Sequence, residues 1–374
     1  MTTISLYSHL TSKQFAEQIL DSLERDLDVD LRPIFADHSK SEAQRRLAVS
    51  ARLMEALIER AENSPDRAEW VSEQDEDHKF LRAFSSGEVD IEPNLCYDVE
   101  NVGTLKSFRG DEIKDFLYSL TKRFENMSKV TNPAILAAQI VGGGMISVSI
   151  PMAAGTIQAL RAGQTLVAAV KAGITNVGMK TAIAAVVIML AALLIWLFLE
   201  NPKKFLGMVI NQTDSNLVVN DWRKGIDGDT GGDLFMRHGS MVSFPEDYES
   251  GRLTKKVQIS KMDRIGPKDD LCYAGIFFAN KNFGGYGVEG VAIYSAQDGS
   301  AKFAQLFACP YSEDNGTAVR VLNGATKDVP ALFRDMYPKR KTQDTTSSGG
   351  FTLVSTVNDN RGGVVGCITC FSKA

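Results

Sequence analysis

The fold turns on the stretch "TAIAAVVIMLAALLIWLFLENPKK", residues 181–204. From Thr181 to Leu199 it holds no charged side chain, and Glu200, Lys203 and Lys204 follow directly. A helix of about 20 apolar residues is long enough to cross the hydrocarbon core of a bilayer. The stretch is therefore either a membrane span or the buried central helix of a folded domain. The choice between these two interpretations decides what the protein does.

A second long uncharged stretch precedes the first. Residues 134–160 carry no charge, and between residues 133 and 199 the charged side chains are Arg161, Lys171 and Lys180. We expect residues 133–204 to form a hydrophobic helical hairpin with arms 134–160 and 181–199 and with these three cations at its tip. The second arm has thirteen large apolar side chains, which favour membrane insertion by roughly 4 to 8 kcal/mol.

Individual residues of the predicted hairpin have expected roles. The side chains expected to enter a membrane are Ile140, Val141, Met145, Ile150, Ile183, Val187, Leu190, Leu194, Trp196 and Phe198. Glycine and proline interrupt helices, so the expected hinges are Gly142, Gly143, Gly144, Pro151, Gly163 and Gly173. Polar residues of the first arm, Ser147, Ser149, Thr156 and Gln158, could line a water-filled lumen after assembly.

The first 132 residues are acidic and helical in pattern. They carry 26 acidic and 17 basic side chains. Apolar residues recur at helical spacing, most clearly from Ile113 to Met127, and Thr11 and Ser12 are possible caps of an earlier helix. We expect an amphipathic helical bundle whose apolar faces cover the hairpin, because an exposed apolar hairpin would cause aggregation.

Residues 205–374 change to β-type patterning. Short apolar runs such as "LCYAGIFFA" (271–279) alternate with clusters of Gly, Asp, Asn and Pro, which indicates about ten strands. We expect an antiparallel β-sandwich there. The predicted fold class is α+β and multidomain: residues 1–132 helical, 133–204 the hairpin, and 205–374 the sandwich.

Several function classes lack their sequence signatures. Lys and Arg form no basic stripe of the kind that binds nucleic acid. The four histidines form no HExxH, and the chain has no GxSxG and no phosphate-binding loop. We therefore expect no enzyme, no cofactor and no nucleic-acid partner. The N-terminus lacks the pattern of a cleaved signal peptide, and five scattered cysteines make no disulfide framework, which favours synthesis in the cytosol.

Two short motifs have alternative interpretations. Asp227, Asp229 and Asp233 lie in a glycine-rich loop that faintly matches a calcium loop, but His238 stands where an EF-hand has its bidentate glutamate. A turn is the favoured interpretation, and no metal site is predicted. Cys367 and Cys370 form a CxxC within an alternating strand, where residues three apart point to opposite faces. We expect two buried cysteines.

Three aromatic residues, Trp222, Tyr286 and Tyr311, lie beside expected loops of the sandwich and are candidates for binding a lipid surface; ordinary packing is the alternative. The segment "VINQTDSNLVVNDWRKG" (209–225), with "YAGIFFA" and "GVEGVAIYS" further on, resembles the strands of aegerolysin- and actinoporin-like β-sandwiches. That resemblance implies membrane recognition and pore formation. The predicted hairpin is similar in architecture to that of colicin-type and other α-helical pore-forming toxins.

These features favour a pore-forming toxin made in the cytosol, released, and associated with the membrane of a target cell. Its expected partners are the lipid membrane and either further copies of itself or a second toxin component. The alternative is a resident membrane protein with two spans and a ligand-binding sandwich. In that case Lys122, Arg123, Lys129, Lys203 and Lys204 would hold both ends of the chain on the cytoplasmic side.

Overall fold

The computed structural model describes residues 6–7, 9–70, 94–220, 232–243, 257–266, 270–281, 284–322 and 328–374. Within these ranges there are nine α-helices. They are α1 (Ser12–Leu27), α2 (Arg32–Ala36), α3 (Glu42–Glu62), α5 (Val99–Ser107), α6 (Asp111–Ser128), α7 (Pro133–Gly142), α8 (Ile150–Arg161), α9 (Leu166–Phe198) and α10 (Val329–Met336). Short 3₁₀ helices occupy Pro65–Glu69 and Tyr337–Lys339.

The helix starts follow local capping chemistry. Of the two possible caps, Thr11 caps α1: its hydroxyl accepts from the Gln14 amide while the Gln14 side chain accepts from the Thr11 amide. Ser41 and Gln44 form the same capping box at α3. Each box satisfies two backbone N–H groups that have no partner inside the helix.

The strands form two mostly antiparallel sheets. The larger has the order β1 (Leu95–Asp98), β7 (Leu271–Asn280), β2 (Lys204–Gln212), β13 (Val364–Lys373), β12 (Phe351–Val357) and β11 (Gln343–Ser348), with β5 (Ser240–Ser243) also paired to β7. The smaller has the order β10 (Gly316–Leu322), β9 (Lys302–Cys309), β8 (Val288–Ala296), β3 (Leu217–Val219) and β6 (Val257–Ile259), with β4 (Leu234–His238) paired to β8. β13 and β2 run parallel.

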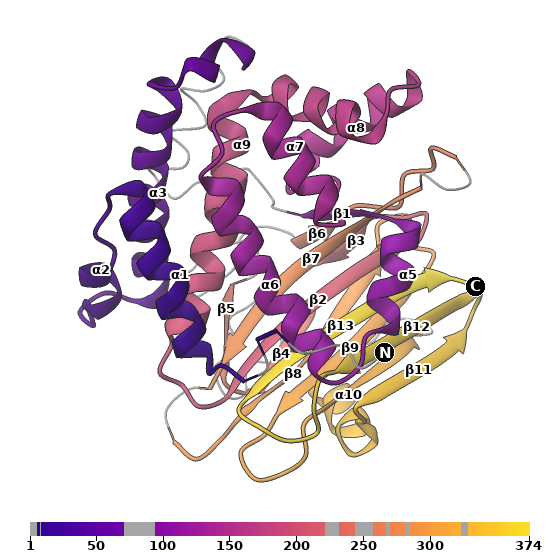
Figure 1. The fold of residues 1–374 in the computed structure, drawn as a ribbon. Coiled ribbons are helices and arrows are strands. Elements are labelled where there is room, and N and C mark those ends of the chain that lie inside the picture. Colours follow the sequence, from indigo (N-terminus) through magenta and orange to yellow (C-terminus); the bar gives the residue numbers. More distant parts are fainter. Residues whose placement is uncertain are drawn as a thin grey trace.

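The two sheets and the helices stack in layers (Figure 1). Strand β7 shows how, because successive side chains of a strand point to opposite faces. Phe277 points toward the smaller sheet, with its ring centroid 5.3 Å from that of Phe307. The next residue, Phe278, points toward the helices and lies 6.0 Å from the ring of Trp196 in α9. Strand β7 is therefore covered on both faces, which explains why all ten of its residues are buried.

The first predicted arm is not one helix. It divides into α7, which ends at Gly142, and α8, which starts at Ile150. Between them Gly144 takes a left-handed conformation (φ 72°), which glycine adopts without strain. Ser147 then forms an isolated bridge with Cys96 of β1, and Ser149 caps α8. A strand contact from the N-terminal region thus interrupts the arm.

The second predicted arm is part of a longer helix. α9 begins at Leu166, so Lys171 and Lys180 lie inside it and not in a loop at the tip of a hairpin. The connection between α8 and α9 covers only residues 162–165, where Gly163 has a positive φ of 81°. Gly178 is non-helical (φ 77°) and marks a kink in α9. The sequence does not predict the first part of this helix, because the small residues between Arg161 and Lys180 show no clear amphipathic pattern.

The coarser prediction of an α+β chain with two mostly antiparallel sheets is confirmed. One strand, β1, comes from the range predicted to be wholly helical and pairs with β7 at the edge of the larger sheet. Trp222, Asp227 and Asp229 lie outside the described residues. The roles predicted for these three residues therefore stay predictions.

Candidate functional site

The candidate site is the long apolar helix α9 together with the groups that hold it. Among the described residues α9 is the one helix long and apolar enough to cross a membrane, with a mean hydropathy of 2.7 over its best window. In this structure 83% of that window is buried. The buried core helix of a soluble protein passes the same test of length and composition.

The first arm supplies no second span. Helix α7 has 10 residues and α8 has 12, which at 1.5 Å per residue gives lengths of about 15 and 18 Å. The hydrocarbon core is about 30 Å thick. The alternative of a resident protein with two ready-made spans therefore lacks its first span in this structure.

Among the helices that the structure describes, α1, α3, α6, α7 and α8 pack most extensively against α9. Figure 1 shows them on the side of the larger sheet that faces away from the smaller sheet. The predicted stripe of α6 is buried, including Ile113, Leu117, Leu120 and Phe124, and so is the apolar face of α1. These amphipathic helices shelter α9 in the way expected of a chain that stores an apolar helix away from water.

Helices α8 and α9 approach unusually closely at two glycines. A Cβ placed on Gly173 would lie 2.4 Å from the carbonyl oxygen of Met152 and from Oγ1 of Thr156. A Cβ on Gly155 would lie 2.9 Å from the Cα of Gly173. Small residues permit this kind of backbone contact between helices. Gly173 is a predicted hinge, but it lies within α9 at the point where α9 crosses α8.

Two cations of α9 are tied to acids from the N-terminal region. Lys180, whose side chain is 11% exposed, lies 3.7 Å from Glu62 at the end of α3. Lys171 lies 3.3 Å from Glu69, and these side chains are 40% and 42% exposed. Arg161, the third predicted tip cation, is exposed at the end of α8. The sequence predicts all three cations at the tip of a hairpin, whereas Lys171 and Lys180 lie in the first half of α9 and pair with acids there.

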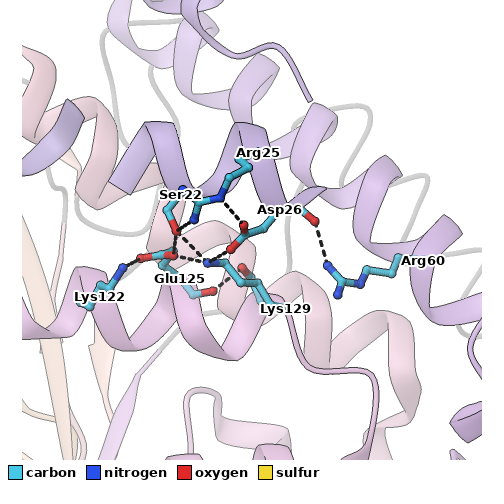
Figure 2. Close-up of polar contacts among 8 residues, drawn as sticks. Ser22, Arg25, Asp26, Arg60, Lys122, Glu125 and Lys129 are labelled. Atoms are coloured by element: carbon cyan, nitrogen blue, oxygen red, sulfur yellow. Dashed lines mark hydrogen bonds and ion pairs between the residues drawn. The ribbon is translucent and has the colours of Figure 1, made fainter. Parts of the chain in front are cut away.

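A polar cluster joins α1 to α6, as Figure 2 shows. The Glu125 side chain is fully buried, and it accepts hydrogen bonds from Ser22 (2.6 Å), Lys122 and Lys129. Lys129 also donates to Asp26 of α1 at 2.6 Å. The contacts cross between the two helices, so this cluster holds α1 and α6 together. We call these five residues the α1–α6 cluster.

The charges in this cluster are stabilised by their neighbours. Burial alone would raise the pKa of Glu125, but the hydrogen bonds from Lys122, Lys129 and Ser22 outweigh burial and lower it. The hydrogen bond from Lys129, with that from Arg25, lowers the pKa of Asp26 to about 2. Both carboxylates are thus ionised at neutral pH, and the cluster stays closed.

The C-terminal end of α9 is held by a buried lysine at the start of β2. Lys204 is 4% exposed, and its Nζ donates to the carbonyl oxygen of Leu197 at 2.8 Å. The same Nζ lies 5.8 Å from the centre of the Trp196 ring. A cation is favourable at a helix C-terminus, but burial lowers the pKa of Lys204 to about 8 while Glu42 opposes that shift.

Two of the predicted surface aromatics lie together at the same end of the molecule. Val288 pairs with Cys309 in the smaller sheet, so Tyr286 and Tyr311 leave neighbouring strands side by side. They are 62% and 56% exposed. The Nζ of Lys281 lies 5.6 Å from the centre of the Tyr311 ring, and the Lys281 amide donates to the Lys203 carbonyl at 3.1 Å. Lys203 lies in the connection between α9 and β2, which places the exposed tyrosines near the end of α9.

The residues expected to enter a membrane are all sheltered here. Those that are buried are Ile140, Met145, Ile183, Val187, Leu190, Leu194 and Trp196. Those that are partly buried are Val141, Ile150 and Phe198. Of the expected hinges, Gly142, Gly143 and Gly144 end α7, Pro151 lies in the first turn of α8, and Gly163 lies between α8 and α9.

The CxxC motif and the described part of the aspartate-rich loop have structural contacts. Cys367 and Cys370 are free and buried, and burial raises the pKa of Cys370 to about 12. Cys367 lies against Gln305 of the other sheet, whereas Cys370 lies 3.1 Å from Gln212 within its own sheet. The prediction of two buried cysteines is confirmed. Asp233 accepts from the Asn220 amide, and no group of three or more metal-ligating side chains occurs among the described residues.

Sequence reasoning missed the residues that lock the helices. Glu125 had a visible signal, because an acid lies between Lys122 and Lys129 at helical spacing on an otherwise apolar face. No comparable sequence signal marks the kink at Gly178 or the burial of Lys204. The kink and the buried ammonium depend on neighbours far away in the sequence.

Comparison with known proteins gives weak similarity only. No protein-family model and no curated protein matches the chain. Similar solved structures include a lipid-binding protein, Nakanori, at 12% identity and a TM-score of 0.30 over 46% of this chain and 72% of that one. A lectin, XCL, of Xerocomus chrysenteron has 11% identity and a TM-score of 0.28 over 46% of this chain and 99% of that one. IP-1A from Alcaligenes faecalis has 12% identity and a TM-score of 0.24, covering 46% and 92%. At these TM-scores the similarities carry no argument about this chain.

Proposed function

We propose that this protein permeabilises membranes by moving α9 from its shelter into the lipid bilayer. The observation that carries the proposal is the combination of length, hydropathy and shelter: a 33-residue apolar helix is covered by five shorter helices. Exchanging protein contacts for acyl chains costs α9 little, because lipid tails are as apolar as its neighbours. The polar α1–α6 cluster then controls how easily the shelter opens.

Surface recognition is assigned to the two sheets, which we interpret as a β-sandwich. Tyr286 and Tyr311 would rest among the lipid headgroups, since a tyrosine ring has an apolar body and a polar tip. Lys203 and Lys281 lie at the same end of the molecule and add positive charge toward anionic headgroups. Docking by this end would bring the C-terminal end of α9 close to the membrane surface.

A pore would need several chains. One spanning helix per chain encloses no lumen, so a water-filled path requires either further copies of this protein or a second component. Polar residues of α8, such as Thr156 and Gln158, would face that path. We propose that the protein acts on target cells after release from the cell that makes it, and this activity requires no catalytic group.

Dye-loaded vesicles test the proposal. Purified protein should be soluble without detergent and should release the dye, and release should fall at least fivefold when Tyr286 and Tyr311 are both changed to Ala. The matched Tyr286→Phe, Tyr311→Phe variant keeps the rings and should retain most of the release. Vesicles that stay intact for all variants, in neutral, anionic and sterol-containing membranes, would contradict the proposed function.

A further inference from the structure

A cavity of about 710 Å³ lies at the C-terminal end of α9. Its walls come from α1, α2, the first turns of α3, the end of α9, β5 and the end of β7. In Figure 1 these elements meet where the helical layer joins the larger sheet. A volume in this range, roughly 300–1,000 Å³, is typical of small-molecule sites.

One part of the cavity wall is apolar. Phe35 of α2 and Phe198 of α9 line it, with their ring centroids 4.4 Å apart, and Leu199 and Met241 extend the same surface. Phe198 is the last residue of α9. A ligand chain that lies on this wall would therefore contact the end of the stored helix directly.

Another part of the wall is cationic. Arg45 donates from Nη1 to the Phe35 carbonyl at 3.0 Å, while its Nε is buried and has no hydrogen-bond partner among the described residues. Arg45 has no carboxylate partner among the described residues, so its guanidinium charge is available to an anionic group in the cavity. Lys13 and His38 also line the cavity, and neither has a carboxylate partner within the described part of the chain.

The acids on the wall are already engaged. Glu17 lies 3.4 Å from Arg32, and Glu42 accepts from the Asn280 side chain at 3.2 Å. Glu200 is exposed at the mouth of the cavity. Arg45 is therefore one of the basic groups of the wall, with Lys13 and His38, that these acids leave without a counter-charge.

We propose that this cavity binds a single-chain amphiphile with an anionic head. The carboxylate or phosphate head accepts hydrogen bonds from Arg45, and the alkyl chain lies between Phe35, Phe198 and Met241. Such a ligand competes with the contact between Phe35 and Phe198 and so loosens the end of α9. The binding site stands by itself, whereas its coupling to the release of α9 rests on the proposed function.

Calorimetric titration of the full chain with dodecyl phosphate and with laurate, below their micellar concentrations, tests the site. We expect saturable binding of one molecule per chain, and the tighter of the two probes identifies the head as a phosphate or a carboxylate. Arg45→Gln should weaken binding at least tenfold, and Ala43→Trp should block it by filling the cavity. Arg52→Gln, on the exposed face of α3 and paired with Glu55, is the matched control and should bind as the unaltered protein does.

Three results would overturn the inference. They are the absence of saturable binding, equal binding by Arg45→Gln and Arg52→Gln, and equal affinity for inorganic phosphate or dodecyl maltoside. Thermal unfolding of each variant shows whether it is folded, so that a loss of binding in a folded Arg45→Gln protein reports on the site. Binding without vesicle leakage would contradict only the proposed function, and leakage without binding would contradict only this inference.

Discussion

The helical layer and the two sheets bury apolar surface by different means. Hydrogen-bond ladders hold the strands together within each sheet, and packed rings such as Phe205, Phe277 and Phe307, whose centroids lie 5.3–5.8 Å apart, join the two sheets. The helices around α9 are separate segments, and polar contacts such as the α1–α6 cluster hold them together (Figure 2). This difference is the basis for our proposal that the helical layer rearranges while the sheets stay fixed as a platform.

The largest effect should come from disturbing the platform. A Cβ on Gly207 of β2 would lie 2.1 Å from the Phe277 ring, so Gly207→Ala forces apart the two sheets. We expect a loss of about 3 kcal/mol in the free energy of unfolding, measured by urea denaturation. The loss should affect helices and strands together, because both rest on β2. A variant that loosens only the helices would contradict the comparison.

Removing the buried acid of the α1–α6 cluster should affect the helical layer alone. Glu125→Ala leaves Lys122 and Lys129 without their shared partner, at a cost of about 2 kcal/mol after allowance for the partial exposure of the lysines. Amide hydrogen exchange should speed up in α1, α6 and α9 and stay unchanged in β2 and β13. Glu55→Ala, which removes an exposed partner of Arg52, is the control and should change neither region.

The crossing of α8 and α9 should respond to a single methyl group. Gly173→Ala places a Cβ against Met152 and Thr156, and we expect it to cost about 1–2 kcal/mol and to raise vesicle leakage. Gly103→Ala in α5 has nothing within 4 Å of its new Cβ, so it should stabilise the protein by about 0.5 kcal/mol. Equal effects of the two substitutions in thermal unfolding would show that the close crossing is unimportant.

Acid should produce the smallest and most gradual change. Contacts that lower a carboxyl pKa stabilise the folded state fully above the unfolded pKa and lose that contribution as the pH falls through the folded pKa. For Asp26 the pKa falls from 3.8 to about 2, and that of Glu125 is lowered as well. Hydrogen exchange of α9 should therefore rise only below about pH 4. Opening of α9 between pH 5 and 6 would contradict this role of the cluster.

The sequence was most informative where the pattern is local. The stripe from Ile113 to Met127, the Thr11 cap and the switch to strands near residue 205 can all be read from neighbouring residues, and each is present in the structure. The candidate helix was also recognisable, since no acid and few cations occur across residues 133–199. These features depend on spacing within one element.

The parts that could not be predicted depend on distant partners. The first arm is interrupted because Ser147 pairs with Cys96, about fifty residues earlier in the chain. The parallel pairing of β2 with β13 joins segments more than 150 residues apart. The packing that buries Lys204 at the end of α9 involves Glu42 and Trp196 from separate helices. No window of sequence contains these neighbours together.

The central claim is that α9 exchanges its shelter for lipid, and Trp196 reports on that exchange most directly. The chain has three tryptophans, so changing Trp70 and Trp222 to Phe leaves Trp196 as the single fluorophore. Vesicles made with brominated acyl chains should quench its fluorescence under the conditions that release dye, while soluble protein should be unaffected by aqueous iodide. Dye release with unquenched Trp196 fluorescence would show that α9 stays among its neighbours and would contradict the account.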